Sequence, residues 1–317
     1  MRHPTTSMPT RTDLHRLPPR LALAAALALM PLAACEAQDA GEDVHASNPE
    51  EDDYADRMAA EHAGENPAVA GAAREGAGTA DVTTEEVVYA TVGGKEIAGY
   101  LARPKTPGEH PGLIVIHEWY GLNDHIETMA RMFAQQGYAA LAVDLYAGES
   151  ADSPERAREL TQSVVEAEAQ ENLRQAYGYL SQTVGAERVG VVGWCFGGGW
   201  ALQTALLLPK EIDATVIYYG RLIDDRAKLA TLESPILGHF GAEDQGIPVE
   251  GVRTFEQTLE ELDKHARIHV YEGAGHAFAN PSGERYQPEA ARTAWDRTLR
   301  FLEAQLADTG QHHAETD

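Results

Sequence analysis

The chain carries short, continuously apolar runs that alternate with segments of helical spacing. The apolar runs predict buried strands at 112–118, 138–144, 188–193, 214–220, 234–241 and 266–273. The helical spacing covers 124–136, 153–183 with an interruption near Gln170, 197–208, 249–265 and 287–306. VVYATV and KEIAGYLARP, separated by Gly93 and Gly94, predict a hairpin before the first buried strand. Strands that alternate with helices predict an α/β fold with a mostly parallel sheet covered on both faces.

The N-terminal residues have the pattern of an export signal. The first 20 residues carry four arginines against one acidic residue, Asp13, and LALAAALALMPLAAC then runs from Leu21 to Cys35. This apolar run is shorter than the roughly 20 residues that a membrane-spanning helix needs. Its end resembles the bacterial lipobox, in which the cysteine is lipidated and becomes the mature N-terminus. We therefore expect a lipoprotein signal over 1–34 and a lipid anchor at Cys35. Glu36 after the cysteine favours the outer membrane, on the periplasmic side of the envelope.

Composition changes again after the signal. Residues 35–85 are rich in acids, Ala and Gly, with no sustained apolar periodicity, so we predict a disordered acidic tether. MAAEH, at 58–62, suits a helical turn or two, but we predict solvated chain there. The folded domain is expected over 86–307, followed by a disordered tail over 308–317.

Charge excludes one class of partner. Fifty acidic residues against 25 basic ones give a formal net charge of −25. Nucleic-acid binding depends on Lys and Arg contacts to phosphates, so no nucleic-acid partner is expected. The hydrophobic share of 43% is enough to bury a core.

A glycine-rich turn follows the apolar run at 188–193. The stretch GWCFGGG places Cys195 between a predicted strand and a predicted helix. A G-x-C-x-G motif between a strand and a helix is the nucleophile elbow of the α/β-hydrolase fold, with cysteine in place of serine. A helix N-terminus also favours a thiolate.

Two downstream residues supply the partners that a thiol nucleophile needs. Asp244 and His276 each lie just after a predicted strand, in the order nucleophile, acid, histidine that this fold uses. The carboxyl ends of parallel strands meet at one edge of the sheet. We therefore predict a catalytic triad of Cys195, His276 and Asp244. If Cys35 is lipidated, Cys195 has no second cysteine with which to form a disulfide.

These motifs together resemble the dienelactone hydrolase, or carboxymethylenebutenolidase, family. The resemblance covers about 86–305 and rests on IHEWYGLN, GYAALAVDLY, GWCFGGG, YYG, GAEDQGIP and GHAF. It implies an α/β-hydrolase that opens a lactone or cleaves a small ester through a thioester intermediate.

The resemblance also implies further site residues. Glu118 would contact the resting thiol and take part in its activation. The backbone N–H groups of Phe196 and Trp119 would form the oxyanion hole. Tyr120 and Tyr219, with Trp119, would line the substrate pocket.

The substrate is where the sequence departs from the family. Members that act on dienelactone hold its carboxylate with arginines, one of them four residues after the catalytic histidine. That position is Asn280 here, and Arg221 and Arg285 are nearby in sequence. Two alternatives stay open: a general esterase or thioesterase on the same scaffold, and a surface-tethered binding protein without turnover. No cofactor or metal site is expected, and the sequence does not indicate an oligomeric state.

Overall fold

An eight-stranded sheet organises the part of the chain that the structure, a computed structural model, describes: residues 49–63 and 81–307. The strand order is β1-β2-β4-β3-β5-β6-β7-β8, antiparallel at β1, β2 and β4 and parallel from β4 to β8. The strands are β1 (Val82–Val92), β2 (Lys95–Pro104), β3 (Gly112–Ile116), β4 (Ala139–Val143), β5 (Val189–Trp194), β6 (Ala214–Tyr218), β7 (Ile236–Gly241) and β8 (Ala266–Tyr271).

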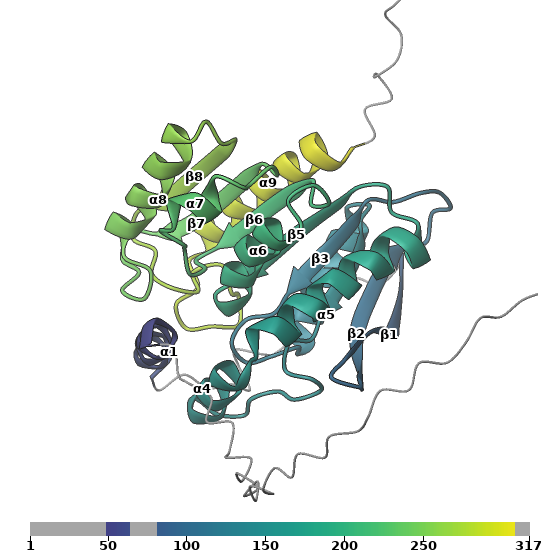
Figure 1. The fold of residues 1–317 in the computed structure, drawn as a ribbon, viewed down its shortest axis with the longest axis horizontal. Helices are drawn as coiled ribbons and strands as arrows, with labels where there is room; N and C mark the ends of the chain where they lie inside the picture. Colours follow the sequence, from purple (N-terminus) through teal and green to yellow (C-terminus); the bar gives the residue numbers. More distant parts are fainter. Residues whose placement is uncertain (1–48, 64–80, 308–317) are drawn as a thin grey trace, which may run out of the picture. The chain divides into compact units, whose positions relative to one another are not determined.

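Helices cover both faces of this sheet (Figure 1). They are α3 (Asp124–Gln135), α4 (Pro154–Ser163), α5 (Glu166–Gly178) with a π-helical turn at Tyr179–Val184, α6 (Phe196–Leu207), α7 (Arg226–Leu229), α8 (Val249–Glu261) and α9 (Pro288–Leu306). A further helix, α1 (Pro49–Glu61), precedes the sheet in the chain and contacts α4. Phe133 of α3 packs on Trp295 of α9 with ring centroids 4.7 Å apart, so these two helices share a face. The α/β-hydrolase fold with a mostly parallel sheet is therefore as predicted.

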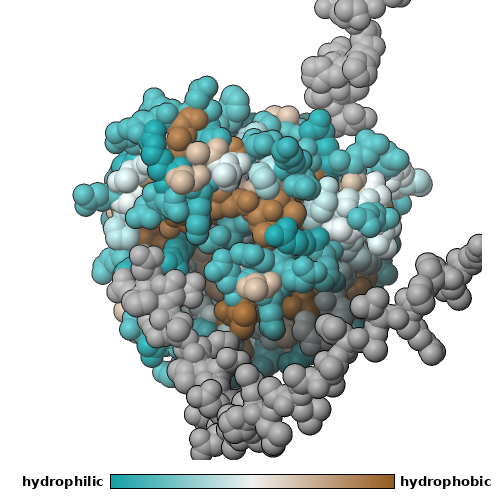
Figure 2. All heavy atoms as spheres, in the orientation of Figure 1, coloured by the Kyte–Doolittle hydropathy of each residue, from teal (hydrophilic) through white to brown (hydrophobic). Residues whose placement is uncertain are grey.

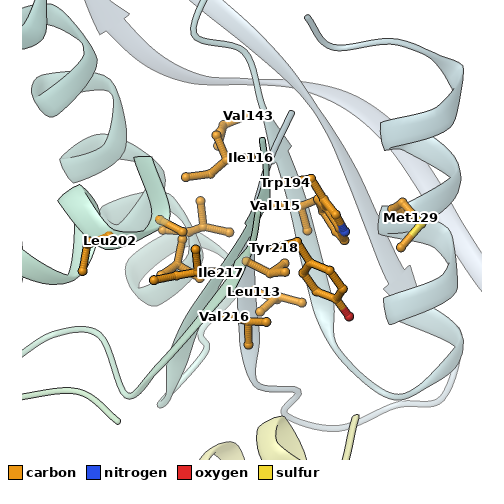
Figure 3. Packing of buried hydrophobic residues seen from close by; sticks show 14 of the residues in the cluster. Leu113, Val115, Ile116, Met129, Val143, Trp194, Leu202, Val216, Ile217 and Tyr218 are labelled. Carbon is orange, nitrogen blue, oxygen red and sulfur yellow. The ribbon is translucent and has the colours of Figure 1, made fainter. Parts of the chain in front are cut away.

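The core lies on either side of the central strands. Side chains of β3, β4, β5 and β6 line both faces, with Leu202 of α6 on one side and Met129 of α3 on the other (Figure 3). Leu113 and Ile116 of β3 are completely buried, as expected for parallel strands covered twice. Burying one such side chain contributes about 1.5–3 kcal/mol.

The face of the molecule shown in Figure 2 is mainly hydrophilic. In the face shown in Figure 2, hydrophobic residues gather in a central band between hydrophilic ones. Among the residues that the structure describes, no helix combines the length and apolarity needed to cross a bilayer. The predicted signal at 1–34, the predicted lipidation site Cys35 and the predicted tail at 308–317 lie outside the described residues.

Part of the predicted tether is wrong. Residues Pro49–Glu61 form α1, which belongs to the same compact unit as the sheet. Tyr54 and Met58 of α1 and His62, the residue directly after it, recur every fourth position, so they lie along one helical face, and all three are buried. The acidic composition concealed this narrow face. The domain also begins earlier than residue 86, because β1 starts at Val82.

Candidate active site

The register of the parallel strands gathers the predicted site residues at one edge of the sheet. Ile116 at the end of β3 is paired with Gly193 of β5, and Gly241 at the end of β7 with Tyr271 of β8. The loops that follow these strands carry Glu118, Cys195, Asp244 and His276.

Cys195 occupies the strained turn that an elbow requires. It stands between β5 and α6 with φ 54° and ψ −118°, a left-handed φ that residues other than glycine rarely adopt. A Cβ on Gly193 would lie 2.0 Å from the carbonyl oxygen of Gly197, and one on Gly197 would lie 2.4 Å from that of His117. Both flanking positions therefore need glycine for the chain to turn this closely.

His276 and Asp244 are brought together as the sequence predicted. Nδ1 of His276 lies 2.8 Å from Oδ2 of Asp244, and both side chains are fully buried. The N–H of Ile247 donates to the other carboxylate oxygen at 2.8 Å, which fixes the carboxylate. Because the carboxylate only accepts, Nδ1 of His276 carries the proton and Nε2 is directed elsewhere.

The thiol of Cys195 lies beside this histidine. Sγ of Cys195 and ring nitrogens of His276 and His62 all lie within 4.8 Å of one another. Nε2 of His276 is buried and has no hydrogen-bond partner of normal geometry among the described residues. The base and the nucleophile are therefore neighbours, and the hydrogen bond between them can tighten when substrate binds.

Electrostatics favour a thiolate next to an imidazolium. Burial raises the pKa of Cys195, but the neighbouring His276, and then His62, outweigh it and lower the pKa to about 6. Burial lowers the pKa of His276, but Asp244 and Cys195 outweigh it and raise the pKa well above its ordinary value. At neutral pH the pair therefore carries one negative and one positive charge.

The two expected oxyanion donors belong to the turn after β5 and the loop after β3. Phe196 is the first residue of α6, and its N–H is one of those at a helix start that have no partner within the helix. Trp119 lies in the loop after β3, with its carbonyl accepting a hydrogen bond from the Tyr146 hydroxyl at 3.1 Å.

Glu118 is held by polar neighbours. Its carboxylate accepts hydrogen bonds from the Tyr219 hydroxyl at 3.3 Å and from Nδ2 of Asn280 at 2.6 Å. His125, at the start of α3, places Nε2 3.9 Å from the same carboxylate. Asn280, the position of the family's arginine, therefore binds Glu118.

Aromatic residues lie against the two histidines next to the thiol. The ring of Tyr219 lies 5.2 Å from that of His276, centroid to centroid. Trp119 and Tyr120 both contact the ring of His62, at 4.9 and 5.9 Å. All three aromatic residues are buried.

Sequence reasoning missed the residues of α1 in this site. Met58 places Sδ 4.0 Å from Sγ of Cys195, and His62 places Nε2 at 4.0 Å from it. The four-residue spacing of Tyr54, Met58 and His62 was the available signal, because it marks one helix face.

Two other buried histidines, His117 and His239, make structural hydrogen bonds that stabilise the fold. Nδ1 of His117 donates to the carbonyl of Glu118 at 2.6 Å, and its Nε2 accepts from the N–H of Leu145 at 3.1 Å. His239 lies between the Tyr271 and Thr298 hydroxyls, and burial lowers its pKa well below the ordinary value. A neutral, fully bonded imidazole is a structural element.

Comparison with known proteins decides the family. The family model described as "Dienelactone hydrolase family" matches residues 97–306, about two thirds of the chain. The chain belongs to the dienelactone hydrolase family. A Synechocystis protein named "Putative carboxymethylenebutenolidase" is 33% identical over 231 residues, which cover 67% of this chain and 93% of that protein.

Solved structures agree with this dienelactone hydrolase assignment. The crystal structure titled "Putative Dienelactone Hydrolase" from Klebsiella pneumoniae is 30% identical, with a TM-score of 0.65. That match covers 70% of this chain and 98% of the other. A dienelactone hydrolase-like promiscuous phosphotriesterase from metagenomic libraries, 22% identical with a TM-score of 0.66, shares the fold. It covers 72% of this chain and all of that one. The protein is therefore a hydrolase of this family.

Proposed function

We propose that this protein hydrolyses a lactone or a small carboxylic ester, with Cys195 as nucleophile, His276 as base and Asp244 as the residue that orients the base. The observation that carries the proposal is the fully buried hydrogen bond between His276 and Asp244, next to a cysteine at a strained elbow. Membership of the dienelactone hydrolase family supports the ester or lactone class.

The chemistry follows from the charges of the pair. The Cys195 thiolate attacks the carbonyl carbon, and the C=O electron pair moves to oxygen as a new C–S bond forms. Collapse of this intermediate breaks the C–O bond to the leaving oxygen, which takes a proton from His276. The product of this half-reaction is a thioester.

Water completes the cycle. His276 accepts a proton from water, which attacks the thioester and releases a carboxylic acid and the thiolate. The N–H groups of Phe196 and Trp119 would stabilise the oxyanion in both halves. In a lactone the leaving oxygen stays attached to the acyl chain, so ring opening yields one product.

The identity of residue 280 affects which substrates we expect the protein to bind. Where the family's dienelactone-binding members use an arginine, this chain has an amide that donates to Glu118. A neutral amide attracts a carboxylate less than an arginine does. We therefore favour a neutral lactone or ester over dienelactone itself.

Hydrolysis of a panel tests the proposal. The purified full chain is assayed on dienelactone, neutral lactones, and acyclic oxygen and thiol esters, beside Cys195→Ala and the matched control Cys35→Ala. We expect Cys195→Ala to reduce kcat by about a thousandfold or more, and Cys35→Ala to leave it unchanged. Acid-quenched enzyme should carry the acyl mass on Cys195.

The other outcomes separate the alternatives. Preference for acyclic esters or thioesters would indicate the general esterase or thioesterase. No turnover of any panel member by the wild-type chain, with no acyl group on Cys195, would contradict the enzyme proposal and favour the tethered binding protein.

The membrane anchor is a separate proposal, supported by the lipobox-like Leu32 to Cys35. In a bacterial host with its own lipoprotein machinery, the mature N-terminus should be a diacylated or triacylated Cys35, which mass spectrometry detects. An unmodified N-terminus at another residue would contradict the anchor and the outer-membrane location.

A further inference from the structure

The buried face of α1 lies in the space in front of the Cys195 thiol. Met58 and His62 each place a side-chain atom 4.0 Å from Sγ. Met58 is 1% exposed and Cys195 is fully buried. The methyl group of Met58 packs so closely on Gly246 that a Cβ at that glycine would lie 1.9 Å from it.

These contacts fill the space next to Sγ on the side of α1. Two sulfur atoms 4.0 Å apart are in van der Waals contact, so no atom fits between them. His62 also stacks on Trp119, a residue of the loop that is expected to bind the oxyanion. A substrate carbonyl can bond to Sγ only after Met58 has moved away.

Polar contacts hold α1 in place from several sides. Arg285 donates to the backbone carbonyl of Glu61 and, at 3.1 Å, to Nδ1 of His62. The N–H of Gln245 donates to the Glu61 carboxylate at 3.1 Å. A second set lies further along the helix: Asp56 is paired with Arg158, and Arg221 lies over the ring of Tyr54.

Some of these contacts are exposed to solvent and can be released. The side chains of Asp56 and Arg158 are 60% and 44% exposed, so solvent and salt weaken their attraction. The hydroxyl of Tyr54 is buried and makes no hydrogen bond with the described residues. Leaving the site would let water solvate that hydroxyl, which favours opening.

The tautomer of His62 argues against a metal at this cluster. Arginine only donates hydrogen bonds, so Nδ1 of His62 accepts and Nε2 carries the proton that faces the thiol. A metal-bound histidine instead donates its second N–H to a carboxylate or carbonyl. His62 is therefore a hydrogen-bond donor to the Cys195 thiolate.

We propose that residues 49–63 are a releasable cover of the active site, in which Met58 fills the acyl position and His62 binds the resting thiolate. This inference rests on the proposed function, because it describes how the same nucleophile is kept from substrate. The cover blocks the enzyme when closed and admits substrate when α1 leaves.

Alkylation of Cys195 tests the cover without requiring ester turnover. The full chain carries Cys35→Ser, so that Cys195 is its only cysteine. The double variant Met58→Ala/His62→Ala is compared with Met132→Ala/His265→Ala, which removes the same residue types from α3 and from the turn before β8. Iodoacetamide labelling is followed by mass spectrometry, on the pH plateau where the thiol of every variant is ionised.

We expect labelling at least about tenfold faster in the Met58/His62 variant and an unchanged rate in the control. An equal or slower rate in the Met58/His62 variant would overturn the proposal. If labelling accelerates in the Met58/His62 variant while no panel ester is hydrolysed, the result supports the cover and contradicts the proposed function.

Hydrogen exchange on the otherwise unaltered chain is the second measurement. A carbamidomethyl group on Cys195 occupies the position of Met58, so α1 should be displaced. Amide exchange over 49–62 should then become faster by at least severalfold, while exchange in α9 stays the same. Unchanged protection of 49–62 after complete labelling would overturn the proposal.

Discussion

Cys195 is costly to hold in its observed backbone conformation. A residue other than glycine at φ 54° costs on the order of 1–3 kcal/mol, and the surrounding packing must supply that free energy. This conformation places the thiol between the end of β5 and the start of α6, beside His276. The strain is thus tied to the chemistry that we propose for this residue.

The charges around Cys195 predict a shifted pH dependence. The pKa of the thiol is lowered to about 6 by His276 and His62, so the thiolate persists down to about pH 6 and is protonated below it. The alkylation rate of the Cys35→Ser chain should therefore fall with an inflection near pH 6. His276→Gln should move this inflection upward, and His62→Gln should do so by less.

His265→Gln is the matched control, because His265 is exposed and lies in the turn before β8, at the end of that strand opposite to the loop that carries His276. Its inflection should equal that of the wild type. An inflection near pH 9, the ordinary value for a thiol, in the unaltered chain would contradict the ion pair.

The elbow glycines predict a large difference between two substitutions of the same kind. In Gly197→Ala the new Cβ would lie 2.4 Å from backbone carbonyl oxygens of Ile116 and His117, which cannot withdraw without moving β3. We expect a loss of roughly 3 kcal/mol or more in the free energy of unfolding. Urea denaturation measures it.

Gly251→Ala provides the comparison. Gly251 lies in α8 and a Cβ there meets nothing within 4 Å, so alanine should stabilise the protein by about 0.5–1 kcal/mol. If the two substitutions changed the free energy of unfolding equally, the close backbone contact at Gly197 would not be the reason that this position needs glycine.

Among the elements, the buried strands were the most predictable. The runs at 112–118 and 188–193 correspond to β3 and β5 to within a few residues, because a strand covered on both faces must be apolar throughout. The four-residue helix α7 was not predicted, since it is shorter than the period needed to recognise a helix.

Longer helices were predicted with less exact boundaries. The interruption expected near Gln170 lies instead at Val164 and Val165, between α4 and α5, where both residues adopt extended backbone. The chain there contains no glycine or proline to mark the break. The π-helical turn that follows α5 has no sequence signature of its own.

The start of α3 predicts a capping effect. The Asn123 side chain accepts hydrogen bonds from the N–H groups of His125 and Ile126, at 3.1 and 3.3 Å. Asn123→Ala should reduce the free energy of unfolding by about 1 kcal/mol, measured by urea denaturation. Asn123→Asp keeps an acceptor at the cap and should lose much less, and a loss as large as that of alanine would contradict the capping role.

At the scale of the whole molecule, the order of motifs predicted which residues meet. Cys195, Asp244 and His276 lie far apart in sequence, but each follows a parallel strand, so the fold itself brings their loops to one edge. No such rule applies to His62. It precedes the sheet, and its position depends on side-chain contacts with Trp119 and Arg285 that no strand order implies.

Whether α1 covers the thiol of its own chain can be tested from how alkylation depends on protein concentration. If α1 protects Cys195 of its own molecule, the rate constant for alkylation should stay constant when the protein is diluted about a hundredfold. Faster labelling on dilution would indicate that α1 covers the thiol of another copy. Stopped-flow or quenched labelling at matched iodoacetamide concentrations distinguishes the two.

The contacts that hold α1 are few and partly exposed, yet covalent continuity changes what they need to achieve. A segment joined to its site by a short connection acts at an effective concentration in the millimolar range, so contacts with a dissociation constant about tenfold below that concentration suffice to keep the site closed about nine tenths of the time. The same weakness makes opening fast. A substrate therefore has to compete only with a weak tethered occupant, and the fraction of open enzyme can be set by the length of the connection, without any change in the triad.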